Sequence, residues 1–338
     1  MRRLFCAALM ACAPHVVFAT PLGDTVQEVV EDHILPRVQR LDETSQVLSQ
    51  AAVSDCDVQS QVLRAAFGSA FDAWIAVSHL RFGPSERDDR AFALAFWPDS
   101  RGATPKALRE LILQKDPAVS SQADFSEVSI AARGFYALEF LLFDDALADI
   151  GSPDYRCLLV QAVAADIAKM GGAIRMDWEN GYVSILTSPS TDGVYRTDEE
   201  AAQELFKALS TGLEFTSEAR LGRPLGTFER PRPNRAEARR SERSARHVDL
   251  VLSSTADLAR ALTVGDEELI AKFETAFGRT ETLLEALDDP SFAGVAEPQS
   301  RLRVEVLQQA VDDIRAVVRD ELGPKLGVAA GFNSLDGD

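Results

Sequence analysis

Apolar residues recur at steps of three and four along almost the whole chain. The first long segment carries this pattern in Val26, Val29, Val30, Ile34, Val38 and Leu41. Because an α-helix has 3.6 residues per turn, this spacing places the side chains on one face. The same spacing returns in Leu63, Phe67, Phe71, Trp74 and Val77, and later in Leu302, Val306, Leu307, Val311, Ile314 and Val318. Sustained alternation with a period of two is essentially absent. The pattern predicts an all-α fold.

Proline and glycine divide these helices. Breaks are expected at residues 82–84, 97–102, 151–153 and 187–193. The clearest break is at residues 222–233, where prolines remove backbone donors and clash with the preceding helical turn. Thr197, followed by Asp198, Glu199 and Glu200, resembles a helix start. We therefore expect two bundles of up-and-down helices, at residues 20–195 and 196–338.

The first 19 residues have the features of a secretory signal peptide. Arg2 and Arg3 precede a short apolar run, and Val17 and Ala19 occupy the small-residue positions of a cleavage site. We expect cleavage after Ala19 and a soluble periplasmic protein; the alternative is a lipoprotein anchored at Cys12. The apolar run is too short to span a bilayer, and no later segment is judged long and apolar enough to do so.

The net charge limits the class of partner, and the cysteine count limits the number of disulfides. The net charge is −18, and loss of Arg2 and Arg3 with the leader lowers it by 2, to −20. Such an acidic molecule repels nucleic acid and suits cations or basic partners. After the leader only Cys56 and Cys157 remain. In an oxidising compartment they form either one disulfide or two buried free thiols.

The segment at residues 132–143 is almost wholly apolar, with a carboxylate in it. A helix that is apolar on all sides is buried, and a buried carboxylate is costly unless it is paired, hydrogen-bonded or bound to a metal. Tyr136 and Glu139 are three residues apart and share a face. One interpretation is that the tyrosine hydroxyl and an arginine satisfy Glu139 inside a bundle. The other is that the pair lines a pocket that holds a ligand or a cation.

This segment also carries a family resemblance. Gly134-Phe135-Tyr136-Ala137-Leu138-Glu139 resembles the GxHxxE segment of the imelysin family, which includes iron-regulated and EfeO-type periplasmic iron-uptake proteins. Three further stretches resemble the family in the same order, at residues 74–84, 96–99 and 327–338. The resemblance therefore extends from about residue 25 to the end of the chain.

The resemblance implies two helical bundles and an exported protein linked to iron acquisition. It also carries a metallopeptidase label, but the motif histidine is replaced by Tyr136. Neutral imidazole is a good zinc ligand, whereas a phenol must first lose its proton. HExxH is absent, so we do not expect a zinc peptidase. Phenolate and carboxylate oxygens suit hard cations, and we hypothesise that Tyr136 and Glu139 bind iron or another oxygen-loving metal ion.

The candidate binding residues come mainly from these stretches. They are Trp74, Arg81, Arg133, Gly134, Tyr136, Glu139, Arg240, Asn333 and Asp336. Arg240 belongs to a run of arginines between residues 230 and 246. This run is either an exposed, salt-bridged helix face or an anion-binding edge, because guanidinium groups match carboxylates and phosphates.

Three functions are consistent with the sequence. The first is a non-enzymatic periplasmic protein that serves iron uptake, with iron-uptake components of the envelope as partners. The second is an imelysin-type peptidase with substituted metal ligands, and the third is an interaction module of an envelope complex. GxSxG, P-loop and dinucleotide-binding motifs in the required context are absent.

Overall fold

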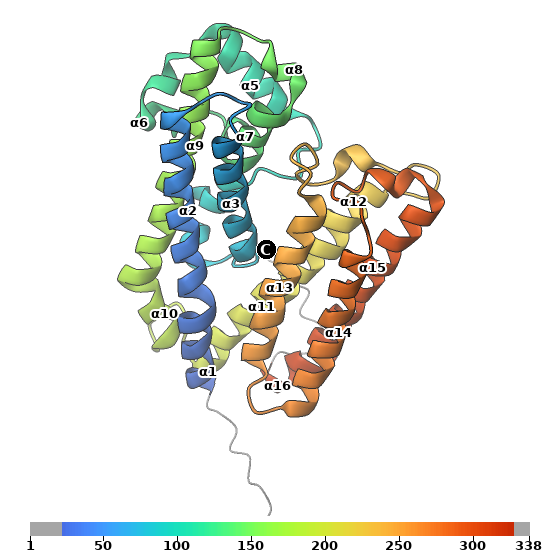
Figure 1. Ribbon diagram of the computed structural model, residues 1–338. Coiled ribbons are helices and arrows are strands. Elements are labelled where there is room, and N and C mark those ends of the chain that lie inside the picture. Colours follow the sequence, from blue (N-terminus) through green and yellow to red (C-terminus); the bar gives the residue numbers. More distant parts are fainter. Residues whose placement is uncertain (1–21, 328–338) are drawn as a thin grey trace, which may run out of the picture.

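The computed structural model describes residues 22–327, and within that range every regular element is a helix. The all-α prediction is confirmed. Two groups of helices stand side by side, the first coloured blue to green and the second yellow to red in Figure 1. The leader at residues 1–19, Asn333 and Asp336 lie outside the described residues.

The long helices of the first group form its scaffold. A continuous rod consists of α1 (Leu22–Glu28), η1 (Val29–Ile34) and α2 (Leu35–Ser54), and it is followed by α3 (Gln61–Val77). A second rod consists of α9 (Pro153–Asp177), η6 (Trp178–Tyr182) and α10 (Val183–Thr187). Ser60 and Ser152 begin α3 and α9 by accepting a bond from the amide three residues on, as N-cap residues do.

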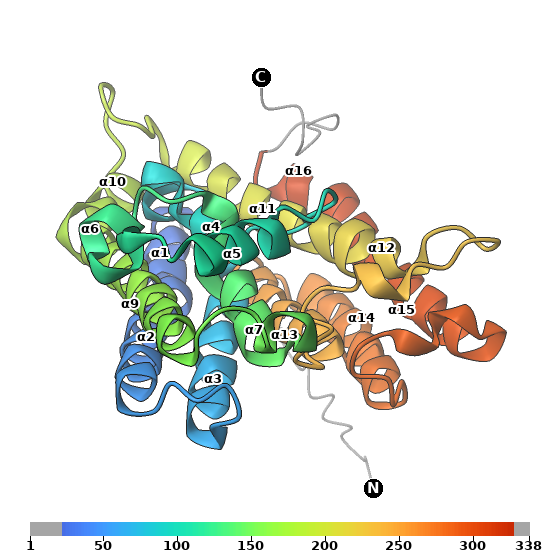
Figure 2. The ribbon, with the colours of Figure 1, turned by 90° about the horizontal axis from the view of Figure 1, so that it is seen from above.

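Shorter helices fill the connection between the two rods. They are η2 (Gly83–Ser85), η3 (Arg87–Asp89), α4 (Arg90–Leu94), α5 (Ala103–Gln114), η4 (Pro117–Ser120), α6 (Gln122–Phe125), η5 (Ile130–Ala132), α7 (Gly134–Phe143) and α8 (Asp145–Ala148). Seen from above, α7 lies near the junction of the two groups, close to α13 (Figure 2).

The second group contains the remaining elements. They are α11 (Asp198–Phe215), η7 (Thr216–Leu221), α12 (Gly222–Leu225), η8 (Pro233–Arg235), α13 (Ser244–Leu262), α14 (Glu267–Glu285), η9 (Ala293–Ala296), α15 (Pro298–Val317), η10 (Val318–Leu322) and α16 (Gly323–Lys325). The predicted boundary at residues 195 and 196 lies in the connection between α10 and α11. The buried apolar residues of both groups nevertheless form one continuous core cluster.

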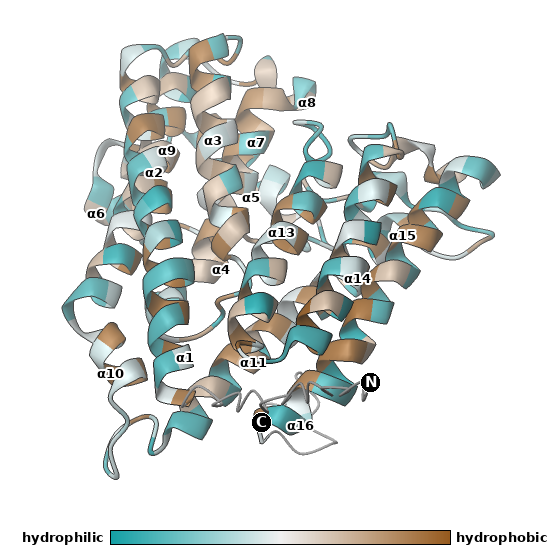
Figure 3. Cartoon of the chain, turned by 60° about the horizontal axis from the view of Figure 1, so that its bottom comes forward, coloured by the Kyte–Doolittle hydropathy of each residue, from teal (hydrophilic) through white to brown (hydrophobic). Residues whose placement is uncertain are grey.

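The predicted helix faces are buried except at two positions of α15, where Val306 is only partly buried and Leu302 is exposed. All the residues of the predicted faces on the first rod and on α3 are buried. On α15, however, Leu302 is 59% exposed, and the buried face runs instead through Val304, Leu307, Val311 and Ile314. The prediction that Leu302 belongs to the buried face of α15 is therefore wrong, because it lies about one position outside the buried stripe. Several rods in Figure 3, such as α2 and α14, carry hydrophobic and hydrophilic residues on different sides of the same helix.

A disulfide closes the first group. Cys56 follows α2 and is bonded to Cys157 in α9, with 5.2 Å between their α-carbons. Of the two states that the sequence leaves open, the structure has the bridged one. The bridge joins the ends of the two helices that pack most extensively against each other.

One expectation about the membrane is wrong as stated. The segment Pro153–Thr187 is long and apolar enough to cross a membrane by length and composition. Its first part, α9, packs against α2 and α7, and 56% of the most apolar window of the segment is buried inside the bundle. The core helix of a bundle meets the same criterion, because it needs apolar residues on most sides.

Candidate functional site

A large cavity lies between the two groups of helices. Its volume is about 570 Å³, and α3, α11 and η7 supply most of its walls. Aromatic side chains dominate the apolar lining, which contains Trp74, Phe82, Phe92, Trp97 and Phe215. Its charged lining residues are Arg81, Glu204, Lys207, Glu214, Glu218, Arg220, Arg223 and Glu237. A concave, mostly apolar site with a few polar groups is the usual form of a ligand pocket.

The helix α7 brings Tyr136 of the motif to this cavity. It begins at Gly134, whose φ is +72°. A Cβ atom on Gly134 would lie 2.1 Å from the carbonyl oxygen of Ala93 and 2.3 Å from that of Leu94. Glycine is therefore required both for the backbone conformation and for the close approach of the chain at residues 93–94. This approach fixes the position of Tyr136, less than one helical turn further on.

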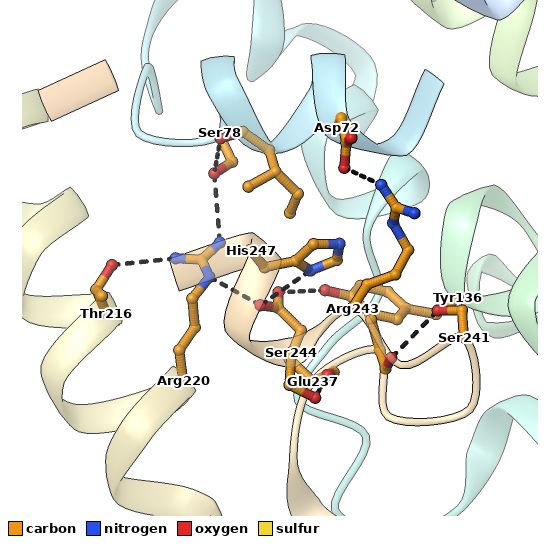
Figure 4. A network of polar contacts seen from close by, with 12 residues as sticks. Asp72, Ser78, Tyr136, Thr216, Arg220, Glu237, Ser241, Arg243, Ser244 and His247 are labelled. Carbon is orange, nitrogen blue, oxygen red and sulfur yellow. Dashed lines mark hydrogen bonds and ion pairs between the residues drawn. The ribbon is translucent and has the colours of Figure 1, made fainter. Parts of the chain in front are cut away.

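Tyr136 belongs to a buried polar network. Its hydroxyl donates a hydrogen bond to Oε1 of Glu237, on the loop before α13 (Figure 4). The other oxygen of Glu237 accepts a 2.8 Å bond from Nε of Arg220, and Nδ1 of His247 lies 3.2 Å from it. The side chains of Arg220, Glu237 and His247 are 4%, 2% and 0% exposed. The network thus joins α7, η7 and α13 at the junction of the two groups.

The guanidinium of Arg220 also reaches both walls of the cavity. Its Nη2 donates to Oγ of Ser78 at 3.3 Å, and its Nη1 donates to Oγ1 of Thr216 at 3.4 Å. Ser78 follows α3, whereas Thr216 begins η7 (Figure 4). Arg220 therefore holds the first group to the second while it neutralises Glu237.

Electrostatics keep the two partners of this network in different protonation states. Burial and the neighbouring Glu237 carboxylate raise the pKa of Tyr136 well above its ordinary value. Burial also raises the pKa of Glu237, but Arg220 and His247 favour the ionised form strongly enough to lower it to about 2. The tyrosine is thus a neutral donor and the glutamate a charged acceptor.

Glu139 has a different partner from the one expected. Its Oε1 accepts hydrogen bonds from the backbone nitrogen of Ser241, at 3.0 Å, and from the Ser241 hydroxyl, at 2.8 Å. Burial raises the pKa of Glu139, although the bonds from Ser241 act in the opposite direction. The interpretation in which the Tyr136 hydroxyl and an arginine satisfy Glu139 is therefore wrong. The Tyr136 hydroxyl bonds to Glu237 instead. Ser241, not an arginine, supplies the hydrogen bonds to Glu139.

A second, smaller cavity lies on the other side of Tyr136. Its volume is about 290 Å³. Trp97, Tyr136 and Arg223 line both cavities and so stand between them. Glu139, Arg235 and Arg240 line only the smaller one. The motif helix α7 therefore presents Tyr136 to both cavities and Glu139 to one.

The structure brings together most of the other candidate residues. Trp74 and Arg81 line the larger cavity, where Nε of Arg81 lies 2.6 Å from a carboxylate oxygen of Glu86. Arg240 lines the smaller cavity; its guanidinium lies 3.5 Å from the centre of the Phe140 ring and pairs with Asp144 at 2.5 Å.

Arg133 stands apart from both cavities. Its Nε lies 2.8 Å from a carboxylate oxygen of Asp166, which is 1% exposed, and its Nη1 donates to the Ser126 carbonyl. It stabilises the connection before α7 and lines neither cavity.

The arginine run at residues 230–246 is in part salt-bridged, as one of the two alternatives expects. Arg243 and Arg246 pair with Asp72 of α3, so that part is salt-bridged to the first group. Arg235 lines the smaller cavity instead.

Sequence reasoning missed Arg220 and the role of Glu237 and His247. Glu237 lies 101 residues after Tyr136 in a loop with no periodic pattern, and nothing local marks it as buried. The one available signal was its position as one of two acids, with Glu242, within the arginine run.

The arrangement does not fit a bare metal ion held by Tyr136 and Glu139. The phenol of Tyr136 keeps its proton and donates a hydrogen bond to Glu237. One oxygen of Glu139 already accepts two hydrogen bonds. Within residues 22–327, no group of three His, Cys, Asp or Glu side chains is placed to hold a metal ion. A phenolate ligand would also have to displace Glu237 from a site where Arg220 neutralises it.

Comparison with known proteins places the chain in a family. The Peptidase M75 family model, described as imelysin, matches residues 34–318. The chain belongs to the imelysin family.

One relative is similar in sequence and two solved structures are similar in fold. Iron-regulated protein A of Synechococcus elongatus is 25% identical over 229 residues, which are 64% of this chain and 58% of that protein, so the match leaves a large part of the relative uncovered. An imelysin-like protein from Psychrobacter arcticum has a TM-score of 0.76 at 18% identity, with 92% of this chain and 98% of that chain covered. An iron-regulated protein A precursor from Parabacteroides distasonis has a TM-score of 0.75 at 13% identity, with 89% and 95% covered.

Proposed function

We propose that this imelysin is an exported, non-enzymatic binding protein that serves iron uptake by holding an iron-bearing ligand between its two helical bundles. Iron is cargo in this proposal, carried within the ligand, and components of an envelope iron-uptake system are the partners.

The observation that carries the proposal is the larger cavity. Aromatic rings from both groups of helices line its 570 Å³, and the Tyr136–Glu237–Arg220 network closes its inner end. Aromatic walls stabilise an organic ligand by burying its apolar surface, and a few polar groups orient it. Because the walls belong to different helix groups, a bound ligand contacts both.

The side chains at the motif favour binding over catalysis. A hydrolytic metal site needs several protein ligands and an open position for water. Here Tyr136 is a neutral donor, Glu237 is neutralised by Arg220, and Glu139 is hydrogen-bonded to Ser241. None of the three is a free base beside a nucleophile.

The link to iron comes from the relatives and from the first residues of the chain. The Synechococcus relative is called iron-regulated protein A. Residues 1–19 match the pattern of a secretory signal, and an exported helical protein with a ligand cavity suits the capture of iron complexes outside the cytoplasm. Secretion of a chain that begins at Thr20 in mass spectrometry would support this part of the proposal.

Ferric citrate is a suitable first probe, and tryptophan fluorescence reports on binding because Trp74 and Trp97 line the cavity. Thr211→Phe would fill space in the cavity and should weaken binding at least about tenfold, by removing room for the ligand. Thr282→Phe is the matched control. Both hydroxyls donate to the carbonyl four residues earlier, but Thr282 is exposed on α14.

Two results would contradict the proposal. One is the absence of ferric citrate binding by the wild-type protein, and the other is equal binding by the Thr211→Phe and wild-type proteins. Hydrolysis of a peptide substrate that stops on addition of a chelator would show instead that the protein is a metallopeptidase.

A further inference from the structure

We propose that the smaller cavity is an anion site, in which Arg223 and Arg235 bind a carboxylate or phosphate group of the ligand. This rests on the proposed function, since it names the chemical class of the ligand held beside α7. Arg223 belongs to α12 and Arg235 to η8, so two short elements on either side of the proline-rich loop supply the site.

Both arginines have cationic groups without an anionic partner. Within residues 22–327, no carboxylate lies within 4.0 Å of either guanidinium, whereas Arg220 and Arg240 beside the cavities each have one. Nε of Arg223 is buried and has no hydrogen-bond partner. A buried donor without a partner is destabilising, so an acceptor supplied by a ligand is favourable there.

The acids that line the cavity do not neutralise these two charges. Both oxygens of Asp99 accept bonds from the first amides of α5, those of Ala103 at 2.9 Å and Thr104 at 2.8 Å. Glu139 is held by Ser241, and the third arginine of the cavity, Arg240, pairs with Asp144. Within the described residues, Arg223 and Arg235 are thus the two arginines of this cavity that lack an ion-pair partner.

The two guanidinium groups also act on each other. Burial lowers the pKa of Arg223, and the charge of Arg235 lowers it further. Neighbouring like charges are destabilising, and an oxyanion between them turns this repulsion into two charge-assisted hydrogen bonds. The planar fork of arginine matches the geometry of carboxylate and phosphate groups.

Neighbouring side chains hold Arg223 and give the site its size. The guanidinium of Arg223 lies 5.7 Å from the centre of the Trp97 ring, within the range of a cation–π contact. The volume of 290 Å³ suits one small anion or the acidic end of a larger ligand. Since Trp97, Tyr136 and Arg223 line both cavities, a ligand with an anionic end here and an apolar part in the larger cavity would contact all three.

Calorimetric titration of the full-length mature protein with citrate, inorganic phosphate and ferric citrate tests the inference. Arg223→Gln and Arg235→Gln should each weaken binding of the anions about 10- to 100-fold, as expected for loss of a charge-assisted hydrogen bond. Arg230→Gln is the matched control. It removes the same charge from the same loop, where Arg230 is exposed and lines neither cavity.

The outcomes separate this inference from the proposed function. Ferric citrate binding that is equal in the wild-type, Arg223→Gln and Arg235→Gln proteins overturns the anion site and leaves the proposed function standing. Failure of the wild-type protein to bind any of the three probes overturns both. Stronger binding of citrate than of phosphate identifies a carboxylate ligand, and the reverse identifies a phosphate. If Arg223→Gln does not fold, Arg235→Gln still tests the anion site, because Arg235 is exposed.

Discussion

Glu237 is the residue on which the junction of the two helix groups depends. It is fully desolvated, and its carboxylate is held by Arg220, Tyr136 and the nearby His247. Breaking a buried ion pair by removing one partner is far more costly than the net value of the pair, because the other charge stays buried without compensation. Loss of any one partner should therefore destabilise the junction.

Replacement of Arg220 by methionine should therefore lower the free energy of unfolding by about 3–5 kcal/mol at neutral pH, because it strands the Glu237 charge. Urea unfolding followed by circular dichroism measures the change. Arg279→Met removes an exposed pair with Asp313, and its loss should cost less than about 1 kcal/mol. Equal losses for the two variants would refute the role given to Glu237.

Gly134 is a second residue whose identity the fold requires. Gly134→Ala places a methyl group against two backbone carbonyls, neither of which is the end of a flexible side chain. We expect a loss of about 3 kcal/mol or more, from overpacking added to the cost of a positive φ. Gly102→Ala is the control, because it has a φ of +65° but no atom within 4 Å, and should cost about 1–2 kcal/mol. Thermal unfolding of both variants decides whether crowding adds to the conformational cost.

At the scale of elements, α2 and α9 form the most extensive helix pair of the first group. They pack along their lengths, and the Cys56–Cys157 disulfide joins them across 101 residues of sequence. A bond that closes so long a loop stabilises the fold mainly by restricting the unfolded chain.

Removal of the disulfide in a Cys56→Ser, Cys157→Ser protein should lower the free energy of unfolding by about 2–5 kcal/mol. Urea unfolding of the wild-type protein in the presence of a reductant should give the same midpoint as the double variant. A reductant that shifts the midpoint of the double variant as well would show that the effect does not come from this bond.

Helix faces could be predicted from the sequence because they depend on local spacing. The stripes on the first rod and on α3 follow from the 3.6-residue period alone. Leu302 shows the limit of this reasoning, since a helix end can place an apolar residue just outside the stripe. The cavity could not be predicted, because it arises where α3, α7 and α11 meet, and no local pattern describes that meeting.

The polar network was hidden for a related reason. Tyr136 and Glu139 were correctly singled out as polar groups on a buried helix, and both are buried. Their partners, Glu237 and Ser241, come from an irregular loop about 100 residues away. Sequence spacing within one helix suggested that the two residues served each other, whereas the fold gives each a separate partner.

For the whole molecule, a buried histidine pair at the junction links stability to pH. Nε2 of His33 lies 2.9 Å from Nε2 of His79, and both rings are buried. Burial is the main cause that lowers the pKa of each, to about 3 for His79. The nearby charges of Arg37 and Arg220 act in the same direction on His79.

The sign of the pH dependence follows from these shifts. Between the ordinary histidine pKa of 6.5 and about 3, the unfolded chain binds protons that the folded chain does not. Stability should therefore fall as the pH drops below about 6.5. Glu237, with a pKa of about 2, adds to the loss only below its ordinary value of 4.5.

The melting temperature of a His33→Gln, His79→Gln protein should accordingly change less between pH 7 and pH 5 than that of the wild-type protein. All other side chains are the same in both proteins. Parallel curves over this range would show that the pair does not govern the acid sensitivity.

We propose that the junction of the two helix groups holds an iron-bearing anion. The most direct measurement is the iron content and intact mass of the protein released from its own cell envelope under mild conditions. We expect the wild-type protein to carry iron together with a small organic ligand. An Arg223→Gln, Arg235→Gln protein should lose both and retain the wild-type melting temperature. A wild-type protein that carries neither iron nor a small molecule in iron-replete cells would contradict it.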